Sequence, residues 1–556
     1  MVILGIGDGV DAGAALVVDS ELVAVAYQER HDQVSRSRSF PWAAVEEVLE
    51  EAGIRNRDVD LITVAGRFTP PFFVRRHPGL RAVAKTSFSA ALDAQVFFQA
   101  MLRQSGLGAF EADRAAEWLE QRFRSRGFVP QRVVLVDVHK SLAEAAYRTQ
   151  PDYETLVMTV HPMGDGVALA VRRGLQGQLD LIWEQKGFAA LHVHLQRCIT
   201  AIGLQPLVDE HRLWALAGRG APDAQLLDML KANLHAQGLR LSRRSYPIPA
   251  HRRQTIYQAL KAAEPEVAAA SVYENLRWTI CGLIKNHLQE WGASRVVLGG
   301  AIFDNPRLCG DIARVEGLKG LWVGPNPGWA SLPVGAAVTE AGIAPAVGTG
   351  HLGRQYGRRQ CERALTVAGI SFEENENPTD IAALLVQGGA VARFSNRAGS
   401  GRFGLGSRSV LVRGDDVEAV ARVRATLKRP EDEEPGCLWV DGADDGLSQA
   451  DLSTFGDQCR FGTVAPLVGD AFAKKYPALV TSDGRAHLQQ VFDEDDPGLR
   501  AIIQALIDQC GCGALACFPL ARKQDPVVAV PGDAVRVFQA SGGLSALAIG
   551  PYLVSR

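Results

Sequence analysis

Two segments that lie far apart in the chain follow the same order of strand, turn and strand. In the first, V-I-L-G-I-G and A-G-A-A-L-V-V-D flank a Gly- and Asp-rich turn near Gly7–Gly13. In the second, T-L-V-M-T-V-H-P and V-A-L-A-V-R-R flank M-G-D-G at Met163–Gly166. Short β-branched runs bounded by Gly and Asp are typical of strands, and a repeated order of elements indicates a duplicated unit. Two interpretations of the turns stay open: backbone N–H groups that bind the anions of one nucleotide, or two ordinary tight hairpins.

Flanking signals predict how these strands are connected. D-S-E at Asp19–Glu21 favours a hairpin turn, and a helix is expected from Pro41 through Glu51. A long amphipathic helix is expected over Glu264–Trp291, and a shorter one over Pro333–Ala341. The fold class predicted for this part is therefore α/β.

A Gly-rich stretch without periodicity, Gly342–Gly353, is the expected linker. Beyond it, helices and strands mix in the manner of an α+β domain of about 200 residues. We therefore predict a first domain over 1–341, a linker over 342–353 and a second domain over 354–556.

Composition excludes several classes of protein. A chain of 556 residues is too long for one hydrophobic core, and 47% apolar with 22% charged residues is typical of globular domains. A net charge of -3 argues against a nucleic-acid partner, and no apolar run reaches the roughly 18 residues of a membrane span. Nine cysteines, with Cys510, Cys512 and Cys517 closest together, indicate reduced thiols rather than a disulfide framework. A cytoplasmic protein is expected.

Six ordered segments resemble the O-carbamoyltransferase family of nodulation-factor and antibiotic biosynthesis, and the resemblance covers nearly the whole chain. In the first domain they are E-H-R-L-W-A-L-A-G-R-G-A-P-D at Glu210–Asp223, V-V-L-G-G-A-I-F-D-N at Val296–Asn305 and P-N-P-G-W-A-S-L-P-V-G-A-A at Pro325–Ala337. In the second they are G-L-G-S-R-S-V-L at Gly404–Leu411, D-G-R-A-H-L-Q-Q-V at Asp483–Val491 and D-P-V-V-A-V-P-G-D-A at Asp525–Ala534. Their order and spacing carry the resemblance.

The resemblance implies a fold and a reaction. The first domain would belong to the actin, chaperone and sugar-kinase (ASKHA) superfamily, and the second would be a YrdC-like α+β domain. In the family, the second domain converts carbamoyl phosphate and ATP, with magnesium, into carbamoyl adenylate. The first domain then passes the carbamoyl group to a hydroxyl of a small-molecule acceptor with the help of an iron-type metal.

The first domain departs from the family at the positions that do this chemistry. The His-Asp pair of the first turn is Val10 and Asp11 here, so the acid persists and the base does not. The two metal-binding histidines four residues apart are Val138 and Leu142, while Asp137 and His139 remain. Asp11 and His139 are therefore the candidate catalytic residues.

The two remaining ligand positions of the family are also changed. His161, followed by Pro162 and then Asp165, takes the place of one ligating Asp, and Trp329 takes the place of the other. Since hydrocarbon side chains cannot bind a metal, we expect the inherited site to be lost and its cavity packed shut. The alternatives are a rebuilt site of Asp137, His139, His161 and Asp165, or a partly buried histidine beside solvated carboxylates.

The second domain keeps only part of its pattern. Arg397, Arg408 and Ser409 persist, whereas an acid has become Gly399 and an arginine has become Phe403, beside Arg402. Gly299 and Gly300 of the first domain, with Arg397, Arg408 and Ser409, are the candidate cofactor-binding residues. The arginines bind an anion or pair with local carboxylates, and the two glycines approach a nucleotide or form a tight turn. The basic segment retains Lys428 and Arg429 ahead of an acidic run, and C-F-P-L-A at Cys517–Ala521 replaces a polar strand end.

Three functions remain in competition. The first is a divergent carbamoyltransferase that uses ATP, magnesium and carbamoyl phosphate on a small-molecule acceptor. The second is a pseudoenzyme that partners a biosynthetic enzyme, which the simultaneous changes at both sites favour. The third is another acyl-activating chemistry, with Cys517 as a thiol nucleophile. A partner enzyme and a homodimer are compatible with these readings.

Overall fold

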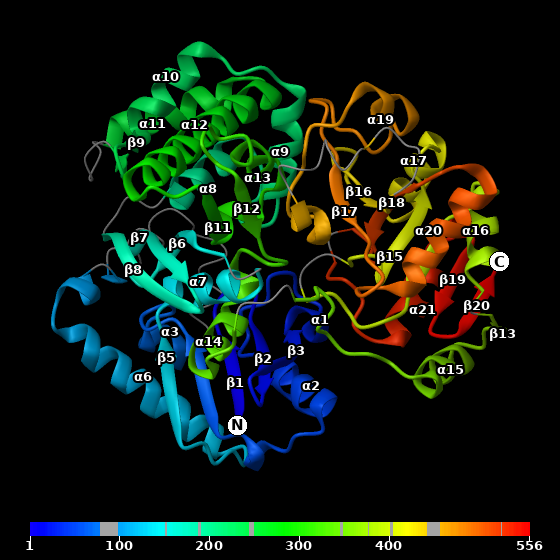
Figure 1. Ribbon diagram of the computed structural model, residues 1–556, viewed down its shortest axis with the longest axis horizontal. Coiled ribbons are helices and arrows are strands. Elements are labelled where there is room, and N and C mark those ends of the chain that lie inside the picture. Colours follow the sequence, from blue (N-terminus) through cyan, green and yellow to red (C-terminus); the bar gives the residue numbers. More distant parts are fainter. Residues whose placement is uncertain are drawn as a thin grey trace. The chain divides into compact units, whose positions relative to one another are not determined.

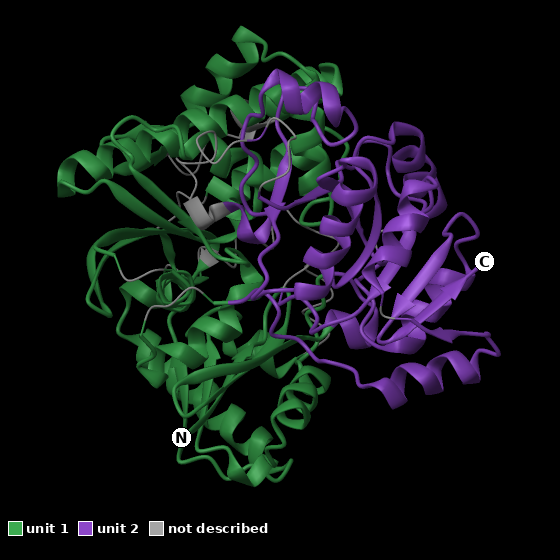
Figure 2. Cartoon of the chain, turned by 45° about the vertical axis from the view of Figure 1, so that its right-hand side comes forward, with its two compact units in different colours: residues 1–28, 36–348 green, residues 29–35, 349–556 purple. Residues whose placement is uncertain are grey.

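The computed structural model describes residues 1–77, 98–99, 101–150, 153–186, 191–243, 250–344, 348–375, 377–400, 404–441, 447, 456–523 and 525–556. Two compact units make up the chain, residues 1–28 with 36–348 and residues 29–35 with 349–556 (Figure 2). The short segment 29–35, which includes α1 (Glu29–Asp32), groups with the second unit, and nothing in the sequence indicated this. The predicted limits of the two domains, 1–341 and 354–556 with a linker over 342–353, stay predictions.

Unit 1, residues 1–28 with 36–348, contains two five-stranded sheets of the same topology (Figure 1). The first sheet has the order β3-β2-β1-β4-β5, and the second has the order β8-β7-β6-β11-β12. In the first sheet β1, β2 and β3 are antiparallel neighbours, while β4 and β5 run parallel to β1. In the second sheet β6, β7 and β8 are antiparallel neighbours, while β11 and β12 run parallel to β6. The predicted duplication is therefore confirmed. The strands are β1 (Val2–Gly7), β2 (Gly13–Val18), β3 (Glu21–Tyr27), β4 (Leu61–Ala65) and β5 (Arg132–Val136), then β6 (Thr155–Gly164), β7 (Val167–Leu175), β8 (Gln178–Lys186), β11 (Arg295–Gly299) and β12 (Gly320–Val323).

Turns of two residues with positive φ close hairpins in both sheets. Asp19 (φ 47) and Ser20 (φ 66) join β2 to β3, and their counterparts Gln176 (φ 50) and Gly177 (φ 75) join β7 to β8. Asp165 (φ 52) and Gly166 (φ 80) join β6 to β7, the strands that correspond to β1 and β2. Two successive residues with positive φ define the turn whose twist fits an antiparallel hairpin. The turns at Asp19 and Asp165 lie where the sequence predicted them.

The helix that follows the last strand of each sheet packs on the other sheet. After β5, α7 (Val138–Arg148) packs on β6, β7 and β11 of the second sheet. After β12, α14 (Leu332–Ala341) packs on β1, β2 and β4 of the first sheet, and α7 and α14 pack against each other. The contact is close because Gly335 of α14 lies against the Ser141 backbone, where an added Cβ would be 1.8 Å from the carbonyl oxygen. The exchanged pair α7 and α14 therefore joins the two repeats.

The remaining elements of unit 1 cover the sheets. The predicted helix after Pro41 is α2 (Trp42–Ala52), which ends at Gly53 in the left-handed conformation, and the long predicted helix is α12 (Pro265–Trp291). The others are η1 (Asn56–Asp58), α3 (Phe72–Arg76), α6 (Leu107–Arg124), α8 (Leu191–Ala201), α9 (Glu210–Arg219), α10 (Ala224–Asn233), β9 (Leu234–Gln237), β10 (Arg240–Arg243), α11 (Ala250–Ala262), η2 (Ala301–Asp304), α13 (Pro306–Ile312) and η3 (Trp329–Ser331). Among the described residues, no helix is long and apolar enough to cross a membrane.

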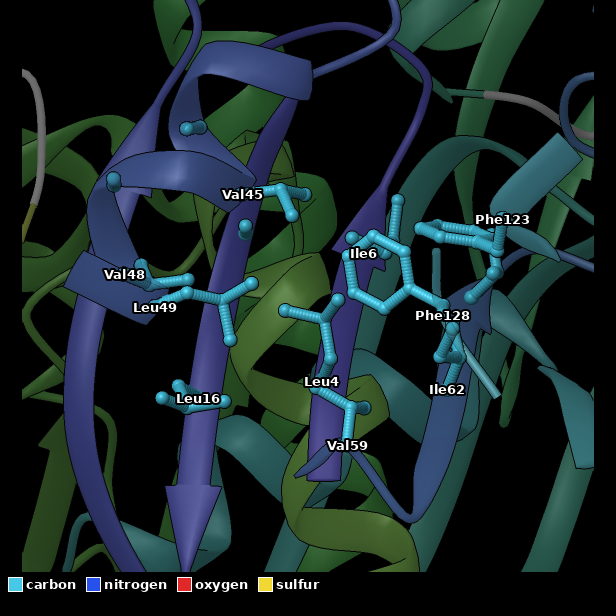
Figure 3. Packing of buried hydrophobic residues seen from close by; sticks show 14 of the residues in the cluster. Leu4, Ile6, Leu16, Val45, Val48, Leu49, Val59, Ile62, Phe123 and Phe128 are labelled. Atoms are coloured by element: carbon cyan, nitrogen blue, oxygen red, sulfur yellow. The ribbon is translucent and has the colours of Figure 1, made fainter. Parts of the chain in front are cut away.

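The core of the first sheet lies between that sheet and the helices α2 and α6. Leu4, Ile6, Leu16 and Ile62 from the strands meet Val45, Val48 and Leu49 of α2 and Phe123 of α6 (Figure 3). Because α2 places Val45, Val48 and Leu49 three or four residues apart, they share one face of the helix. This core holds the strand ends from which the candidate residues project.

Unit 2, residues 29–35 with 349–556, is built on one eight-stranded mixed sheet of order β13-β20-β19-β14-β15-β18-β16-β17. Its strands are β13 (Glu373–Glu374), β14 (Val391–Phe394), β15 (Arg408–Arg413), β16 (Gly436–Trp439), β17 (His487–Gln490), β18 (Ala514–Pro519), β19 (Ala546–Ile549) and β20 (Tyr552–Ser555). Its helices after α1 are α15 (Arg358–Val367), α16 (Pro378–Val386), α17 (Val417–Thr426), η4 (Gly456–Phe461), α19 (Asp470–Lys475), α20 (Pro497–Cys510) and α21 (Pro531–Gln539). Non-consecutive neighbours in the sheet bring the predicted site segments, far apart in sequence, together.

Candidate functional site

Four of the five positions at which the first domain departs from the family it resembles meet in one apolar cluster. Val10, Val138, Leu142 and Trp329 all belong to it, and none is more than 8% exposed. Ala301, Leu332 and Ala336 complete the packing around them. The sequence therefore placed these positions correctly relative to one another, and their side chains fill the space that they share.

His139 lies beside this cluster, buried and with both ring nitrogens engaged. Its Nδ1 is 2.8 Å from the Thr159 hydroxyl, and its Nε2 is 3.0 Å from the Val167 carbonyl oxygen. Gly164 leaves room for the ring, because a Cβ there would lie 2.4 Å from Nε2. Burial lowers the pKa of His139 to about 4, so its imidazole is neutral at pH 7. His139 is therefore held as a neutral hydrogen-bonding group, and its role as a catalytic base stays a prediction.

His161 is equally buried and lies against Trp329. The two ring centroids are 4.0 Å apart, and His161 Nδ1 accepts a hydrogen bond of 3.3 Å from the Ala301 amide. Within the described part of the chain, His161 Nε2 and Trp329 Nε1 have no hydrogen-bond partner. Burial lowers the pKa of His161 well below its ordinary value. Neutral imidazole could bind a metal, but an indole beside it cannot.

Asp137 and Asp165, the two carboxylates of the alternative rebuilt metal site, accept hydrogen bonds from backbone amides. Asp137 caps α7 by accepting from the amides of His139 and Lys140, and it pairs with Arg103 at 2.7 Å. Asp165 accepts from the amides of Arg67, Phe68 and Val138 at 2.8–3.0 Å. Over the described ranges no group of three His, Cys, Asp or Glu side chains is arranged to hold a metal ion. The residues at the inherited positions do not fit the iron-type metal of the family, and its loss stays a prediction.

Asp11, the other candidate catalytic residue, lies in a buried ionic network. It has the left-handed conformation (φ 52), and its carboxylate is 3.2 Å from Arg36 Nη1. Arg36 Nη2 is 3.8 Å from Glu210, whose other oxygen is 3.2 Å from His192 Nε2. Burial alone would raise the pKa of Glu210, yet His192 and Arg36 lower it to about 2. Sequence reasoning missed Arg36 and His192, because neither lies in a recognisable motif.

Gly299 and Gly300 form the turn that leads from β11 into η2. Gly300 has φ 117, and a Cβ there would lie 1.9 Å from the Val160 carbonyl oxygen. Its amide donates to the carbonyl oxygen of Pro327 at 2.5 Å. The close neighbour of Gly300 is thus strand β6, which accounts for the glycine, and contact with a nucleotide stays a prediction.

Arg408 of unit 2 lines a cavity of about 370 Å³. Tyr356, Arg358, Phe394 and Asn396 are among the other lining residues. The Arg408 guanidinium lies 3.8 Å from the ring centroid of Phe394 and is buried, with its side chain at the edge of β15. This volume falls in the range of small-molecule sites, about 300–1,000 Å³.

The charge of Arg408 has no carboxylate partner in the described part of unit 2. Its Nη1 and Nη2 donate to backbone carbonyl oxygens of Arg354, Ser395, Asn396 and Ser407 at 2.6–3.3 Å. Its Nε is buried without a partner. Burial, with Arg30 nearby, lowers the pKa of Arg408. Of the two alternatives left open for this arginine, pairing with a local carboxylate is not seen among the described residues, and anion binding stays a prediction.

Arg397 and Ser409 do not share that cavity. The Arg397 guanidinium donates to the carbonyl oxygens of Gly353 and Leu352 at 3.0 and 3.1 Å. Successive residues of a strand point to opposite faces, so Ser409 faces away from Arg408. Its hydroxyl accepts from the Gly406 amide at 3.1 Å and hydrogen-bonds to the thiol of Cys517.

The other altered positions of unit 2 lie near this second face or outside the described residues. Arg429 pairs with Glu433 at 3.3 Å, so the acidic run neutralises the basic segment before it. Burial raises the pKa of Cys517 to about 11, which keeps its thiol protonated at pH 7. The changes at Arg402 and Phe403 lie outside the described residues.

Comparison with known families agrees with the motifs and the topology. Residues 2–338 match the family described as Carbamoyltransferase N-terminus, and residues 382–556 match Carbamoyltransferase C-terminus. The chain therefore belongs to the carbamoyltransferase family. The predicted fold class is confirmed as far as the topology shows it: a duplicated α/β part, followed by a second part built on one mixed sheet with helices.

Relatives are similar along their length at low identity. Nodulation protein NolNO of Sinorhizobium fredii is 23% identical, covering 98% of this chain and 79% of that protein. The uncharacterized protein sll1178 of Synechocystis sp. is 21% identical, covering 95% and 92% respectively. Among solved structures, HypF of T. kodakarensis is 12% identical with a TM-score of 0.31, covering 61% of this chain and 47% of that one.

Proposed function

We propose that this protein transfers a carbamoyl or related acyl group from carbamoyl phosphate, through an adenylate formed with ATP, to a small-molecule acceptor in specialised-metabolite biosynthesis. The observation that carries the proposal is the buried guanidinium of Arg408, which lines a 370 Å³ cavity without a carboxylate partner. An uncompensated cation in a low-dielectric wall attracts an anion of the right size.

The chain's own residues would assist in stated ways. Arg408 supplies positive charge and one free N–H, at Nε, to a phosphate or phosphoanhydride oxygen. Arg358 lies on the same wall and pairs with Glu374, so it adds charge that is partly neutralised. ATP with magnesium supplies the adenylyl group when bound, and the residues named here fit its anionic part.

The experiment is carbamoyl-phosphate-dependent release of pyrophosphate from ATP with excess magnesium. We expect release by the native protein and at least a tenfold loss in Arg408→Ala. Arg422→Ala is the matched control, because Arg422 is exposed and also donates to a backbone carbonyl, that of Gly388 at 3.0 Å. Arg408→Lys keeps the charge without the fork of donors, and it should retain part of the activity.

Thermal unfolding of each variant separates lost chemistry from lost structure, since Arg408 also ties two loops together. Full pyrophosphate release by a folded Arg408→Ala variant would contradict the proposal. So would the absence of both release and nucleotide binding in the native protein.

A second function is favoured by a different observation. The apolar cluster of Val10, Val138, Leu142 and Trp329 occupies the positions at which the resemblance implies the transfer site. A protein that retains the fold but not this site suits a binding subunit for another biosynthetic enzyme. Pyrophosphate release without transfer to any hydroxyl acceptor, together with co-purification of a pathway enzyme, would favour this pseudoenzyme function.

A further inference from the structure

Buried polar atoms without a hydrogen-bond partner gather in one region of unit 1. Among the described residues they include His161 Nε2, Trp329 Nε1, His192 Nδ1 and the Asp11 oxygen Oδ1, and none of these four residues is more than 4% exposed. A polar group that stays unsatisfied inside a protein costs a sizeable share of the small net stability. Four such groups close together therefore indicate a polar molecule that binds them.

A closed series of contacts keeps the four residues together. The His161 ring packs on Trp329, and Trp329 belongs to the same apolar cluster as Val10, the residue before Asp11. The ionic network that starts at Asp11 ends at His192. Burial is the main cause of the lowered pKa of His161, and nearby His192 contributes to it. The series returns to its starting point, so the unsatisfied atoms surround one part of unit 1.

Both rings present a hydrogen-bond donor to this region. His161 Nδ1 accepts from the Ala301 amide, and burial keeps the imidazole neutral, so its single proton is on Nε2. An indole nitrogen such as Trp329 Nε1 can only donate. With ring centroids 4.0 Å apart, the two N–H groups can reach one small acceptor atom. Asp11 Oδ1 belongs to a carboxylate that pairs with Arg36, so it accepts.

This pattern decides the chemical class of the ligand. A metal ion would meet the indole N–H of Trp329, which cannot ligate it, and a phosphate would meet the carboxylate of Asp11. A neutral group that carries an acceptor beside a donor satisfies both N–H groups and the carboxylate. The carbonyl oxygen of a carbamoyl group accepts two hydrogen bonds, and its NH2 donates to a carboxylate. Internal water, which also donates and accepts, is the competing occupant.

We propose that unit 1 binds a carbamoyl group by its carbonyl oxygen through the N–H groups of His161 and Trp329, while Asp11 accepts from its NH2. Both rings stand at positions where the resemblance implies metal ligands. Hydrogen-bond donors thus take over the polarisation of the carbonyl group that the family's metal supplies. The ligand class follows from these donors and this acceptor, whereas a role in transfer rests on the proposed function.

The transfer step would use the same contacts. The acceptor hydroxyl oxygen bonds to the carbamoyl carbon, the bond from that carbon to the adenylate phosphate oxygen breaks, and AMP leaves with the bonding electrons and the hydroxyl proton. Negative charge develops on the carbonyl oxygen on the way, where two fixed N–H donors stabilise it. The two N–H groups therefore act in place of a cation at this oxygen.

The indole N–H of Trp329 reports on the ligand directly. We would label the nine tryptophan side chains of the native protein with nitrogen-15, assign the Trp329 cross-peak with Trp329→Phe, and titrate methyl carbamate by NMR. We expect a saturable downfield shift of this cross-peak and no shift for Trp291, which is 40% exposed. Methyl acetate lacks the NH2 and should bind about tenfold more weakly, the value of one hydrogen bond to a carboxylate.

Variants make the result specific. His161→Phe keeps an aromatic ring without the N–H and should weaken methyl carbamate binding about tenfold, as should Trp329→Phe when binding is measured by calorimetry. Trp291→Phe, which removes an exposed indole, should bind like the native protein. Thermal unfolding shows whether each variant is folded, and if one is not, the comparison of methyl carbamate with methyl acetate on the native protein decides.

Two outcomes would overturn the proposal. One is a Trp329 cross-peak that methyl carbamate leaves unshifted in the native protein, which would assign these atoms to internal water. The other is equal affinity for methyl carbamate and methyl acetate. Pyrophosphate release tests the proposed function separately. Methyl carbamate binding without release would support this site and contradict the function proposed for Arg408, and release without binding would do the reverse.

Discussion

His139 allows a quantitative test of whether the candidate base of unit 1 is a buried neutral group. Burial lowers its pKa to about 4 in the folded protein, against about 6.5 for a histidine in water. As the pH falls below about 6.5, the unfolded chain binds a proton at His139 that the folded chain binds only near pH 4, so acid favours unfolding. Between pH 7 and pH 5 this single group should remove about 2 kcal/mol of stability, and about 3 kcal/mol by pH 4.

The assay is urea unfolding of the native protein and of His139→Gln at pH 7 and pH 5. Glutamine does not titrate, so the variant should lose about 2 kcal/mol less than the native protein over this range. His77→Gln, at an exposed position, should show the native pH dependence. The pKa of His161 is also lowered, first by burial and then by the nearby His139, so the burial part, which is common to both proteins, cancels from the difference.

The result that would refute this reasoning is an identical pH dependence for the native protein and His139→Gln. It would mean that the imidazole of His139 titrates as it does in water, and therefore that solvent reaches it. A catalytic role for His139 as a proton acceptor near neutral pH would then gain support.

Three further outcomes follow from the packing of single residues, each measured by urea unfolding at pH 7. Gly335→Ala should lower the free energy of unfolding by about 2 kcal/mol or more, because its Cβ would lie 1.8 Å from the Ser141 carbonyl oxygen. Gly282→Ala, whose Cβ would have its nearest neighbour at 3.7 Å, should raise the free energy of unfolding by up to about 1 kcal/mol. Equal effects of the two changes would show that α7 and α14 are loosely packed. Leu142→Ala should cost about 3 kcal/mol, and a cost below about 1 kcal/mol would mean that the apolar cluster is not filled. Asp496→Asn should cost about 3 kcal/mol, because it leaves Arg393, now paired at 2.7 and 2.8 Å, buried without a counter-charge, and an unchanged midpoint would contradict this.

Local chemistry explains what could be predicted from the sequence. The hairpin turns at Asp19 and Asp165, and the helix end at Gly53, are set by residues that tolerate positive φ, and such signals stand in a few neighbouring positions. The convergence of Val10 and Trp329 was predictable only through the family resemblance, since they are distant in sequence.

The ionic network shows what could not be predicted. Arg36, Glu210 and His192 come from three separate segments, and nothing in their spacing indicates that they meet. By contrast, the sequence did indicate that Arg408 and Ser409 point to opposite faces of the sheet. Both lie on β15, and successive side chains of a strand alternate between its two faces.

The exchange of α7 and α14 between the sheets of unit 1 has a consequence for how this unit can come apart. Each repeat supplies a helix that covers the sheet of the other repeat. Residues 138–148 follow the first sheet in sequence and pack on the second, and residues 332–341 follow the second sheet and pack on the first. A chain interrupted after β5 would release one bare sheet face, and during synthesis the first sheet must wait for a helix made nearly two hundred residues after β5. The two repeats should therefore melt in one transition, and a gene fragment encoding either repeat alone should yield an aggregation-prone product.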